Sequence, residues 1–71
     1  MEAITRKIAQ VIREQRKTAG LSQEQLAEKA DIDRTYVSLI ERGKVNMTVI
    51  VVAKIAKALG VSLSSIIKKS E

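Results

Sequence analysis

Residues 21–43 read LSQEQLAEKADIDRTYVSLIERG, and their pattern predicts two short helices joined by a tight turn. Ser22 is a good helix N-cap, and Gln25 three residues later completes a capping box for the first helix. Asp33 is a second N-cap, and Gly43 stands where glycine commonly ends a helix. The apolar residues of the two helices fall on facing sides, which is typical of a helix-turn-helix.

Three glycines divide the chain into helical segments. Gly20, Gly43 and Gly60 each follow a stretch of helical periodicity, where a residue with positive φ is easiest to place. There is no proline, no low-complexity segment and no convincing strand. We therefore expect an all-α fold in a single domain over residues 1–71, with the helix-turn-helix at about residues 22–42. The expected helices cover about residues 3–19, 22–30, 33–42, 47–59 and 62–67.

The fourth expected helix is unusually apolar. Residues 49–52 are Val, Ile, Val and Val, which favours a strand on propensity alone. Residues 54–59 continue this run with helical spacing and good helix formers, so we expect a helix capped by Asn46, with Thr48 as the other candidate cap. The residues expected to face the core from this helix are Val49, Val52, Ala56 and Leu59.

A second apolar side remains on the same helix, because Ile50 and Val51 point away from that face and Ile55 sits at its edge. A helix that is apolar on more than one side needs a second cover. We expect a second copy of the chain to provide it, through a dimerisation surface at about residues 47–67. The alternative is that the last helix folds back over these residues. The predicted interface residues are Ile50, Val51, Ile55, Ile66 and Ile67.

The composition limits the possible functions. The chain has 13 basic and 8 acidic residues, and its net charge of +5 favours a polyanionic partner. Its single aromatic residue makes stacking on single-stranded bases a poor main binding mode. Histidine and cysteine are absent, so we expect no enzyme, no metal, no cofactor and no small-molecule ligand. No apolar run is long enough to span a membrane, and a reducing cytoplasm fits the absence of cysteine.

Several spaced residues also match a known pattern. They are Arg16, Gly20–Gln23, Leu26, Ala27, Ile32–Tyr36, Ser38, Ile40–Gly43 and Ala56–Val61. On these residues the chain, from about Ile8 to Ile67, resembles the Cro/phage-repressor family of helix-turn-helix proteins, also called the xenobiotic-response-element type. The resemblance implies a five-helix, repressor-like bundle. Residues 33–36, 40–42 and 46–48 are most similar to the small controller proteins of restriction–modification systems, although phage repressors and antitoxins share most of them.

The helix over residues 33–42 has a polar outer face, and Arg34 stands in its first turn. A cation there opposes the positive end of the helix dipole at a cost of roughly 0.3–1 kcal/mol, which suggests a functional reason. Arginine pairs bidentately with guanine in the major groove. We therefore expect Arg34 to read bases, the alternative being a solvated surface arginine. The resemblance implies base contacts by Thr35 and Ser38 as well.

Contacts with the DNA backbone are expected on both sides of this helix. The N–H groups at the start of the preceding helix form a natural phosphate site, and the resemblance places Gln23 there, touching the first residues of the recognition helix as well. Gln23 could instead be a helix-start residue without a ligand, Tyr36 a packing residue, and Asn46 a helix cap. The predicted backbone contacts are Ser22, Gln23, Tyr36, Arg42, Lys44 and Asn46.

Glu41 lies beside the apolar face of the recognition helix, so it should be partly buried and needs a partner. The resemblance implies an ion pair with Arg16, which would tie the first helix to the recognition helix. Two residues depart from the family pattern. Asp31 stands at a turn position where glycine is usual, and it tolerates the left-handed region better than most residues. Met47 stands where many relatives have proline.

Together these features predict a sequence-specific transcriptional regulator that binds double-stranded DNA. It would act as a homodimer on a palindromic operator, with its recognition helices about one DNA turn apart and with two dimers able to occupy adjacent sites. Resemblance to the controllers implies activation and repression of its own operon. The rival hypothesis is a protein-interaction module with the same fold. Such a module would carry an apolar or acidic outer face on the recognition helix, where this chain has cations and hydroxyl groups.

Overall fold

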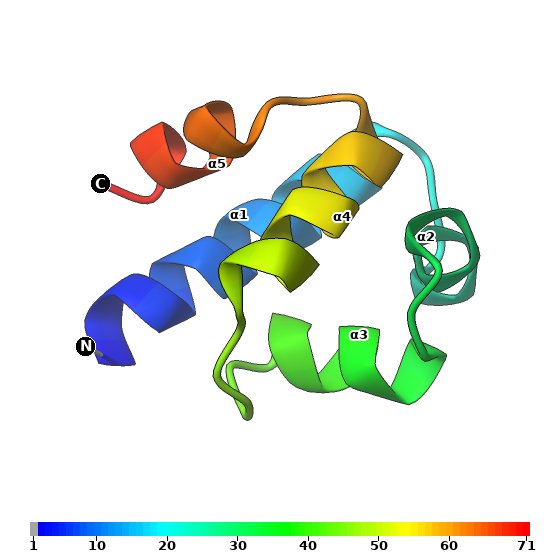
Figure 1. Cartoon of the computed structure of the whole chain (residues 1–71), viewed down its shortest axis with the longest axis horizontal. Coiled ribbons are helices and arrows are strands. Elements are labelled where there is room, and N and C mark those ends of the chain that lie inside the picture. The colour runs from blue at the N-terminus through cyan, green and yellow to red at the C-terminus, as the bar shows by residue number, and fades with distance from the viewer. Residues whose placement is uncertain (1) are drawn as a thin grey trace.

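The computed structural model describes residues 2–71, and these form five α-helices with no strand among them (Figure 1). The all-α prediction is therefore confirmed. The helices are α1 (Glu2–Thr18), α2 (Gln23–Ala30), α3 (Arg34–Glu41), α4 (Val49–Leu59) and α5 (Leu63–Lys69).

The caps of the two central helices are those predicted. The Ser22 hydroxyl accepts the N–H of Gln25 at 3.0 Å, while the Gln25 side chain accepts the N–H of Ser22 at 2.8 Å, which completes the capping box. The Asp33 carboxylate accepts the N–H of Thr35 at 2.7 Å and so begins α3. The bonds that the N–H groups of Gln25 and Thr35 donate satisfy helix N–H groups that have no partner inside their own helix, and they fix where α2 and α3 start.

The turn between α2 and α3 passes through the left-handed region at Asp31, where φ is 58° and ψ is 47°. The N–H of Asp31 bonds back to the carbonyl of Glu28, and the N–H of Ile32 bonds to that of Ala27, so the end of α2 is closed by backbone hydrogen bonds. The strain at this position is small because aspartate tolerates it, as the sequence suggested. All three glycines also have positive φ, as predicted.

The start of α4 differs from the first prediction. Its cap is Thr48, whose hydroxyl accepts the N–H of Val51 at 3.1 Å, and the helix begins at Val49 and not at Met47. The preferred assignment of Asn46 as the cap is wrong. Asn46 lies exposed in the loop before α4, so its side chain remains available for another role.

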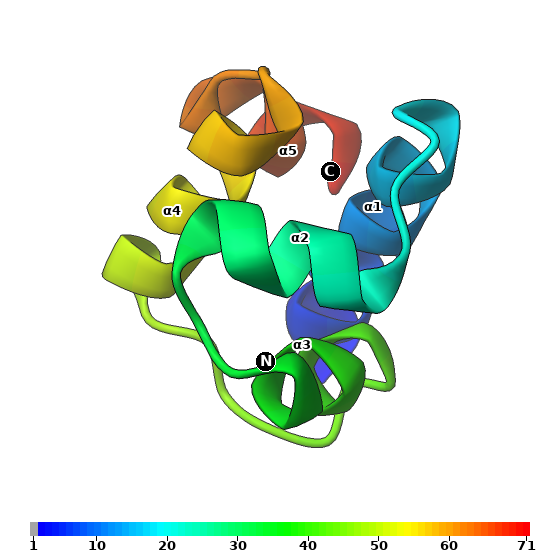
Figure 2. The same cartoon turned by 90° about the vertical axis from the view of Figure 1, so that its right-hand side faces the viewer.

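The core consists of two groups of buried side chains that share α1 and α4. Ile12 and Ile55 belong to the larger group with residues of α2 and α3, whereas Val11 and Val52 belong to the smaller group with α5. The larger group is completed by Leu26, Ala27, Ala30, Val37 and Ile40, and the smaller one by Ala56 and Ile66. Figure 2 shows α2 lying across this arrangement with α3 beneath it, so the helix-turn-helix is held against α1 and α4.

The predicted orientation of α4 is partly wrong. Val49, which was expected in the core, is 71% exposed, while Ile55, expected at the dimer surface, is fully buried. The buried face is centred on Val52, Ile55 and Ala56, so it is rotated away from Val49. Ile66 is also only 1% exposed because it packs against α1 and α4. Since neither Ile55 nor Ile66 reaches the surface, the prediction that they contact a second copy is wrong.

The last helix covers one side of α4 and leaves another open. Through Ile66, α5 packs over Val52 and Ala56, but Ile50 remains 70% exposed. The helix runs to Lys69, further than predicted, and the hydroxyl of buried Ser70 donates to the carbonyl of Ile66 at 2.7 Å. Within residues 2–71 no single helix is long and apolar enough to cross a membrane, and only α4 and α5 taken together, bent by 102°, meet that length and composition.

Candidate nucleic-acid interface

The recognition helix has a buried side and an outer side. In Figure 1 α3 lies in the plane of the view while α2 is seen nearly end-on, so the two helices cross steeply. Val37 and Ile40 of α3 are completely buried against α1, α2 and α4. Their burial fixes the rotation of α3 about its own axis, and therefore decides which residues it presents to solvent.

The residues predicted to read bases begin the outer side of α3. Arg34 is the first residue of the helix, and both it and Thr35 are exposed, while Ser38 one turn later is half-buried. The neighbouring carboxylate of Asp33 accepts the N–H of Thr35 in the helix cap. Arg34 forms no ion pair with the side chains that the structure describes, those of residues 4–71, and the single salt bridge among them lies elsewhere. Its guanidinium group is therefore free to meet an outside partner.

That salt bridge joins Arg16 of α1 to Glu41 of α3, as the resemblance implied. The Arg16 Nε donates to Glu41 Oε2 at 2.8 Å, and its Nη2 donates to Oε1 at 3.1 Å. The Arg16 Nη1 donates to the carbonyl of Leu21 at 2.8 Å. The two side chains are 12% and 2% exposed, respectively. This arrangement fastens the end of α3 to α1 and to the turn that precedes α2.

A further hydrogen bond at this carboxylate was not foreseen. The Gln23 Nε2 donates to Glu41 Oε1 at 3.2 Å, so the first residue of α2 contacts the last residue of α3. The resemblance had placed Gln23 against the first residues of α3 instead. No local sequence signal could have found the bond, because the two residues are 18 positions apart. The only available clue was that a buried carboxylate can accept more hydrogen bonds than one arginine donates to it, so Glu41 could have a second donor.

The other predicted backbone contacts lie around α3 in different environments. Arg42, Lys44 and Asn46 are exposed after the recognition helix. Ser22 is exposed too, but its hydroxyl and N–H both take part in the capping box. Tyr36 is half-buried, and it packs against the larger core group.

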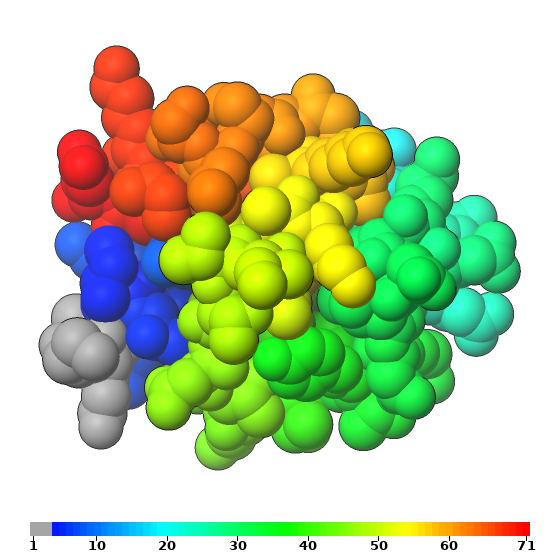
Figure 3. All heavy atoms as spheres, viewed as in Figure 1, coloured from blue at the N-terminus to red at the C-terminus, as the bar shows by residue number. Residues whose placement is uncertain are grey.

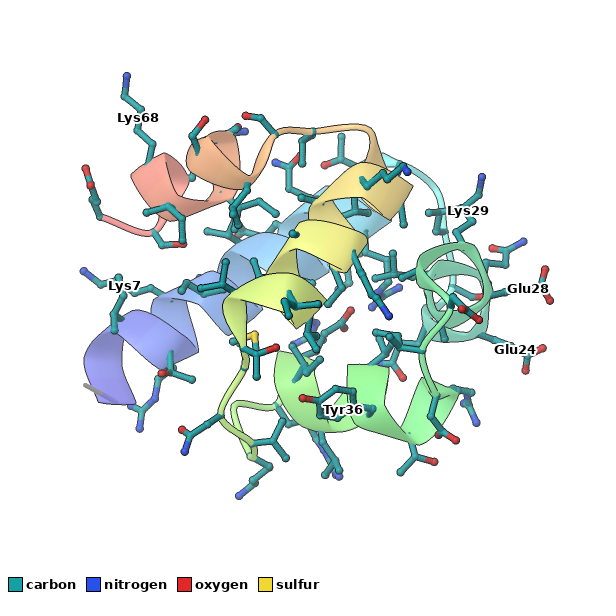
Figure 4. The ribbon with its side chains drawn as sticks, in the orientation of Figure 1. Lys7, Glu24, Glu28, Lys29, Tyr36 and Lys68 are labelled. Carbon is teal, nitrogen blue, oxygen red and sulfur yellow. The ribbon has the colours of Figure 1, made fainter. Side chains whose placement is uncertain are left out.

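The outer side of α2 carries acidic side chains, in contrast to the basic residues on and after α3. Glu24 and Glu28 point away from the bundle, next to Lys29 (Figure 4). Carboxylates repel phosphate, so a nucleic acid would approach α3 and the loop after it in preference to this side of α2. Among residues 4–71, whose side chains the structure describes, no group of acidic side chains is placed to hold a metal ion.

An uncovered apolar patch lies away from α3. Figure 3 shows the yellow-green start of α4 open to solvent, with α5 above it and α2 and α3 to its right. The patch consists of Val49, Ile50 and Ile67, which are 71%, 70% and 39% exposed. It borders a hollow of about 200 Å³ between α1, α4 and α5. The hollow is lined by Thr5, Ile8, Met47, Val49, Val52, Leu63 and Ile67.

A family model for helix-turn-helix proteins, HTH_3, matches residues 12–66, which include α2, α3 and α4, the second part of α1 and the first part of α5. The chain belongs to the Cro/C1-type helix-turn-helix family. It is therefore a DNA-binding regulator of transcription, since this family consists of transcriptional regulators and not of enzymes.

Similar proteins include controllers of restriction–modification systems. The chain is 45% identical over 51 residues to control protein C.MunI from Mycoplasma sp, covering 72% of this chain and 69% of that protein. The crystal structure of the controller C.AhdI from Aeromonas hydrophila matches with a TM-score of 0.84 and 39% identity over 87% of this chain and 94% of the other. The crystal structure of the controller C.Esp1396I matches with a TM-score of 0.86 and 37% identity, over 94% of this chain and 90% of the controller's chain.

Proposed function

We propose that this chain is a sequence-specific controller of a restriction–modification operon, acting as a homodimer on double-stranded DNA. The similarity to C.MunI, C.AhdI and C.Esp1396I supports this assignment, because those proteins match over most of their own length. The whole of residues 1–71 would serve as one DNA-binding domain. The observation that carries sequence-specific reading is the exposed, unpaired guanidinium group of Arg34 at the first position of α3.

In this proposal α3 enters the major groove with its N-terminal end towards the bases. Arg34 pairs with guanine, and Thr35 and Ser38 contact neighbouring base edges. The helix is supported for this role because its inner side is fully buried and its last residue is held by a salt bridge. A helix that cannot rotate presents the same three side chains each time it binds, which is what discrimination between sequences requires.

Contacts to the sugar-phosphate backbone fix the register of α3 in the groove. Arg42, Lys44 and Asn46 would meet one strand from the loop after α3, and Gln23 would meet the other from the start of α2. The first N–H groups of α2 support a phosphate at Gln23, since helix N-termini attract anions. Ser22 and Tyr36 would add hydroxyl contacts at the edges of the same interface.

The second copy would cover the apolar patch of Val49, Ile50 and Ile67. A two-fold axis at this patch brings the same residues of both chains together, and the hollow beside Val49 offers space for a side chain of the partner. Exposed apolar residues grouped in this way are typical of an interface. The two α3 helices would then lie about 34–36 Å apart, in successive major grooves of a palindromic operator.

Two such dimers would occupy adjacent operators, and the protein would work in the cytoplasm without a small-molecule ligand. Its occupancy would then be set by its own concentration. The similarity to the controller proteins supports activation and repression of its own operon.

The test is a binding titration with about 30 base pairs of DNA from upstream of the chain's own gene and a scrambled duplex of equal length. We expect preference for the natural duplex by roughly a hundredfold or more, the usual order for specific binding. Sedimentation of the complex should give two chains per operator, or four on adjacent sites. Equal binding of both duplexes, fading steeply with salt, would leave only non-specific attraction and favour a protein-interaction module.

A further inference from the structure

We propose that Glu41 is a positioning residue for DNA binding, which holds the Gln23 side chain in the orientation that a backbone phosphate requires. The inference rests on the proposed function, because it assigns the reason for a contact within that interface. It concerns a residue that never touches DNA itself, since the Glu41 side chain is buried.

The acceptor side of the bond is rigid. Both oxygens of Glu41 accept hydrogen bonds from Arg16, at 2.8 Å and 3.1 Å, and the carboxylate cannot turn without breaking one of them. Arg16 is itself held by the carbonyl of Leu21, two residues before Gln23. The Gln23 amide therefore bonds to a group whose position is set from α1, from the turn before α2 and from α3.

The donor, the side-chain amide of Gln23, can make a second hydrogen bond. The amide group of a glutamine carries two N–H bonds, and Glu41 uses one of them. The second N–H remains for a phosphate, next to the backbone N–H groups at the start of α2. Glutamine is among the side chains that lose most rotamer freedom when they become fixed. Because the bond to Glu41 fixes this side chain before DNA arrives, less entropy is lost on binding.

The hydrogen bond between Gln23 and Glu41 connects the proposed phosphate contact to the helix that is proposed to read bases. Gln23 is the first residue of α2 and Glu41 the last residue of α3, so the bond links a phosphate contact on one helix to the helix that reads bases. A bond that only stabilised the fold would change the free energy of unfolding and leave the affinity of the folded protein unchanged. A positioning bond changes the affinity for any duplex, because phosphate contacts do not depend on base sequence.

The test uses a double-mutant cycle between Gln23→Ala and the paired change Arg16→Met with Glu41→Leu. The paired change replaces a buried ion pair with apolar side chains, which proteins often tolerate, and it removes the acceptor while keeping Gln23. Dissociation constants for the natural and scrambled duplexes are measured below the thermal transition of each variant. We expect each change alone to weaken binding about fivefold to tenfold and the combination to add little more.

A conservative variant provides the matching control. Glu41→Gln keeps an oxygen that can accept from Gln23, and its folded form should bind DNA within about twofold of the wild type. Unchanged affinity in the Arg16→Met, Glu41→Leu protein, or effects that multiply in the combination, would overturn the positioning role. A wild type without preference for its own upstream duplex would overturn the proposed function, and the positioning role with it.

A second measurement does not depend on DNA or on any variant folding. In the free wild-type protein the side-chain amide proton of Gln23 that bonds to Glu41 should exchange more slowly than the amide protons of exposed Gln10, which serves as the internal reference. The Gln23 side chain should also show a single rotamer by NMR couplings. Rapid exchange and averaged couplings equal to those of Gln10 would show that Glu41 does not hold Gln23 in solution, and would overturn the inference even if DNA binding were specific.

Discussion

Ile50 and Ile55 lie on the same helix and face opposite ways: Ile50 is 70% exposed, whereas Ile55 is completely buried between α1, α2 and α3. The two residues are chemically identical, so their different roles come only from the direction in which α4 presents them. One belongs to the core of a single chain, and the other is available to a second chain. This difference can be tested residue by residue.

We expect Ile50→Lys to abolish the dimer while the chain stays folded. A lysine in the apolar patch would place a charge in the buried part of the interface without touching the core. Sedimentation velocity at micromolar concentration should give a monomer, and the helical circular dichroism signal should remain. A dimer of unchanged affinity would show that the apolar patch is not the interface.

Ile55→Ala should act on the monomer instead. Truncating a fully buried isoleucine typically costs 2–5 kcal/mol of unfolding free energy, through lost burial and a residual cavity. Thermal or urea denaturation followed by circular dichroism would measure this loss, with Ile50→Ala as the matched control on the same helix. If the two alanine variants lost equal stability, the burial difference on α4 would be wrong.

Arg34→Ala should reduce discrimination between duplexes rather than overall attraction. A bidentate contact with guanine is worth about 1–3 kcal/mol, so the preference for the natural duplex should fall by that amount. Lys44→Ala is the control, since loss of a phosphate contact weakens binding to both duplexes and lowers the salt slope by about one. Titrations at several salt concentrations distinguish loss of sequence preference from uniform weakening. If Arg34→Ala weakened binding to both duplexes equally and kept the preference, Arg34 would contact the DNA backbone.

Glu41→Ala should be strongly destabilising. Its removal leaves the Arg16 guanidinium in a site where the two side chains are 12% and 2% exposed, and breaking one side of a buried pair costs about 3–5 kcal/mol. Glu28→Ala on the exposed side of α2 should change the unfolding free energy by no more than about 0.5 kcal/mol. Urea unfolding of both variants measures the difference, and similar midpoints would mean that the salt bridge contributes little.

Thr48→Ala and Asn46→Ala should separate helix capping from DNA binding. Loss of the Thr48 hydroxyl removes the bond to the N–H of Val51 and should cost about 1 kcal/mol of stability. Asn46→Ala removes no cap, so it should leave stability unchanged and weaken binding to any duplex. Parallel thermal melts and DNA titrations test both statements. A loss of stability in Asn46→Ala would restore asparagine as the cap.

The positions of helix starts were largely predictable, because a cap and the N–H group it bonds lie within three residues of each other. Ser22 and Asp33 both cap as expected. The prediction was less reliable before α4, where Asn46 and Thr48 both have suitable side chains. Which of the two residues caps α4 depends on the path of the loop between α3 and α4, and no local sequence pattern predicts that path.

The exposure of the outer residues of α3 also followed from the sequence. Arg34 and Thr35 are exposed because Val37 and Ile40 set the inner side at helical spacing. Gln23 is different, since its bond to Glu41 connects residues from two helices. The contact exists only after α2 and α3 have packed together, and the sequence contains no signal for it.

The sequence by itself determined the five helices, the helix-turn-helix and the cation at the head of its second helix. These features depend on caps, turns and periodicity, which act within one or two helical turns. The tertiary structure alone decided that Ile55 and Ile66 are core residues, that Val49 and Ile50 are exposed, and that Gln23 reaches Glu41. A run of apolar residues such as that in α4 fits the core in several rotations, and only packing against side chains from distant helices selects one of them.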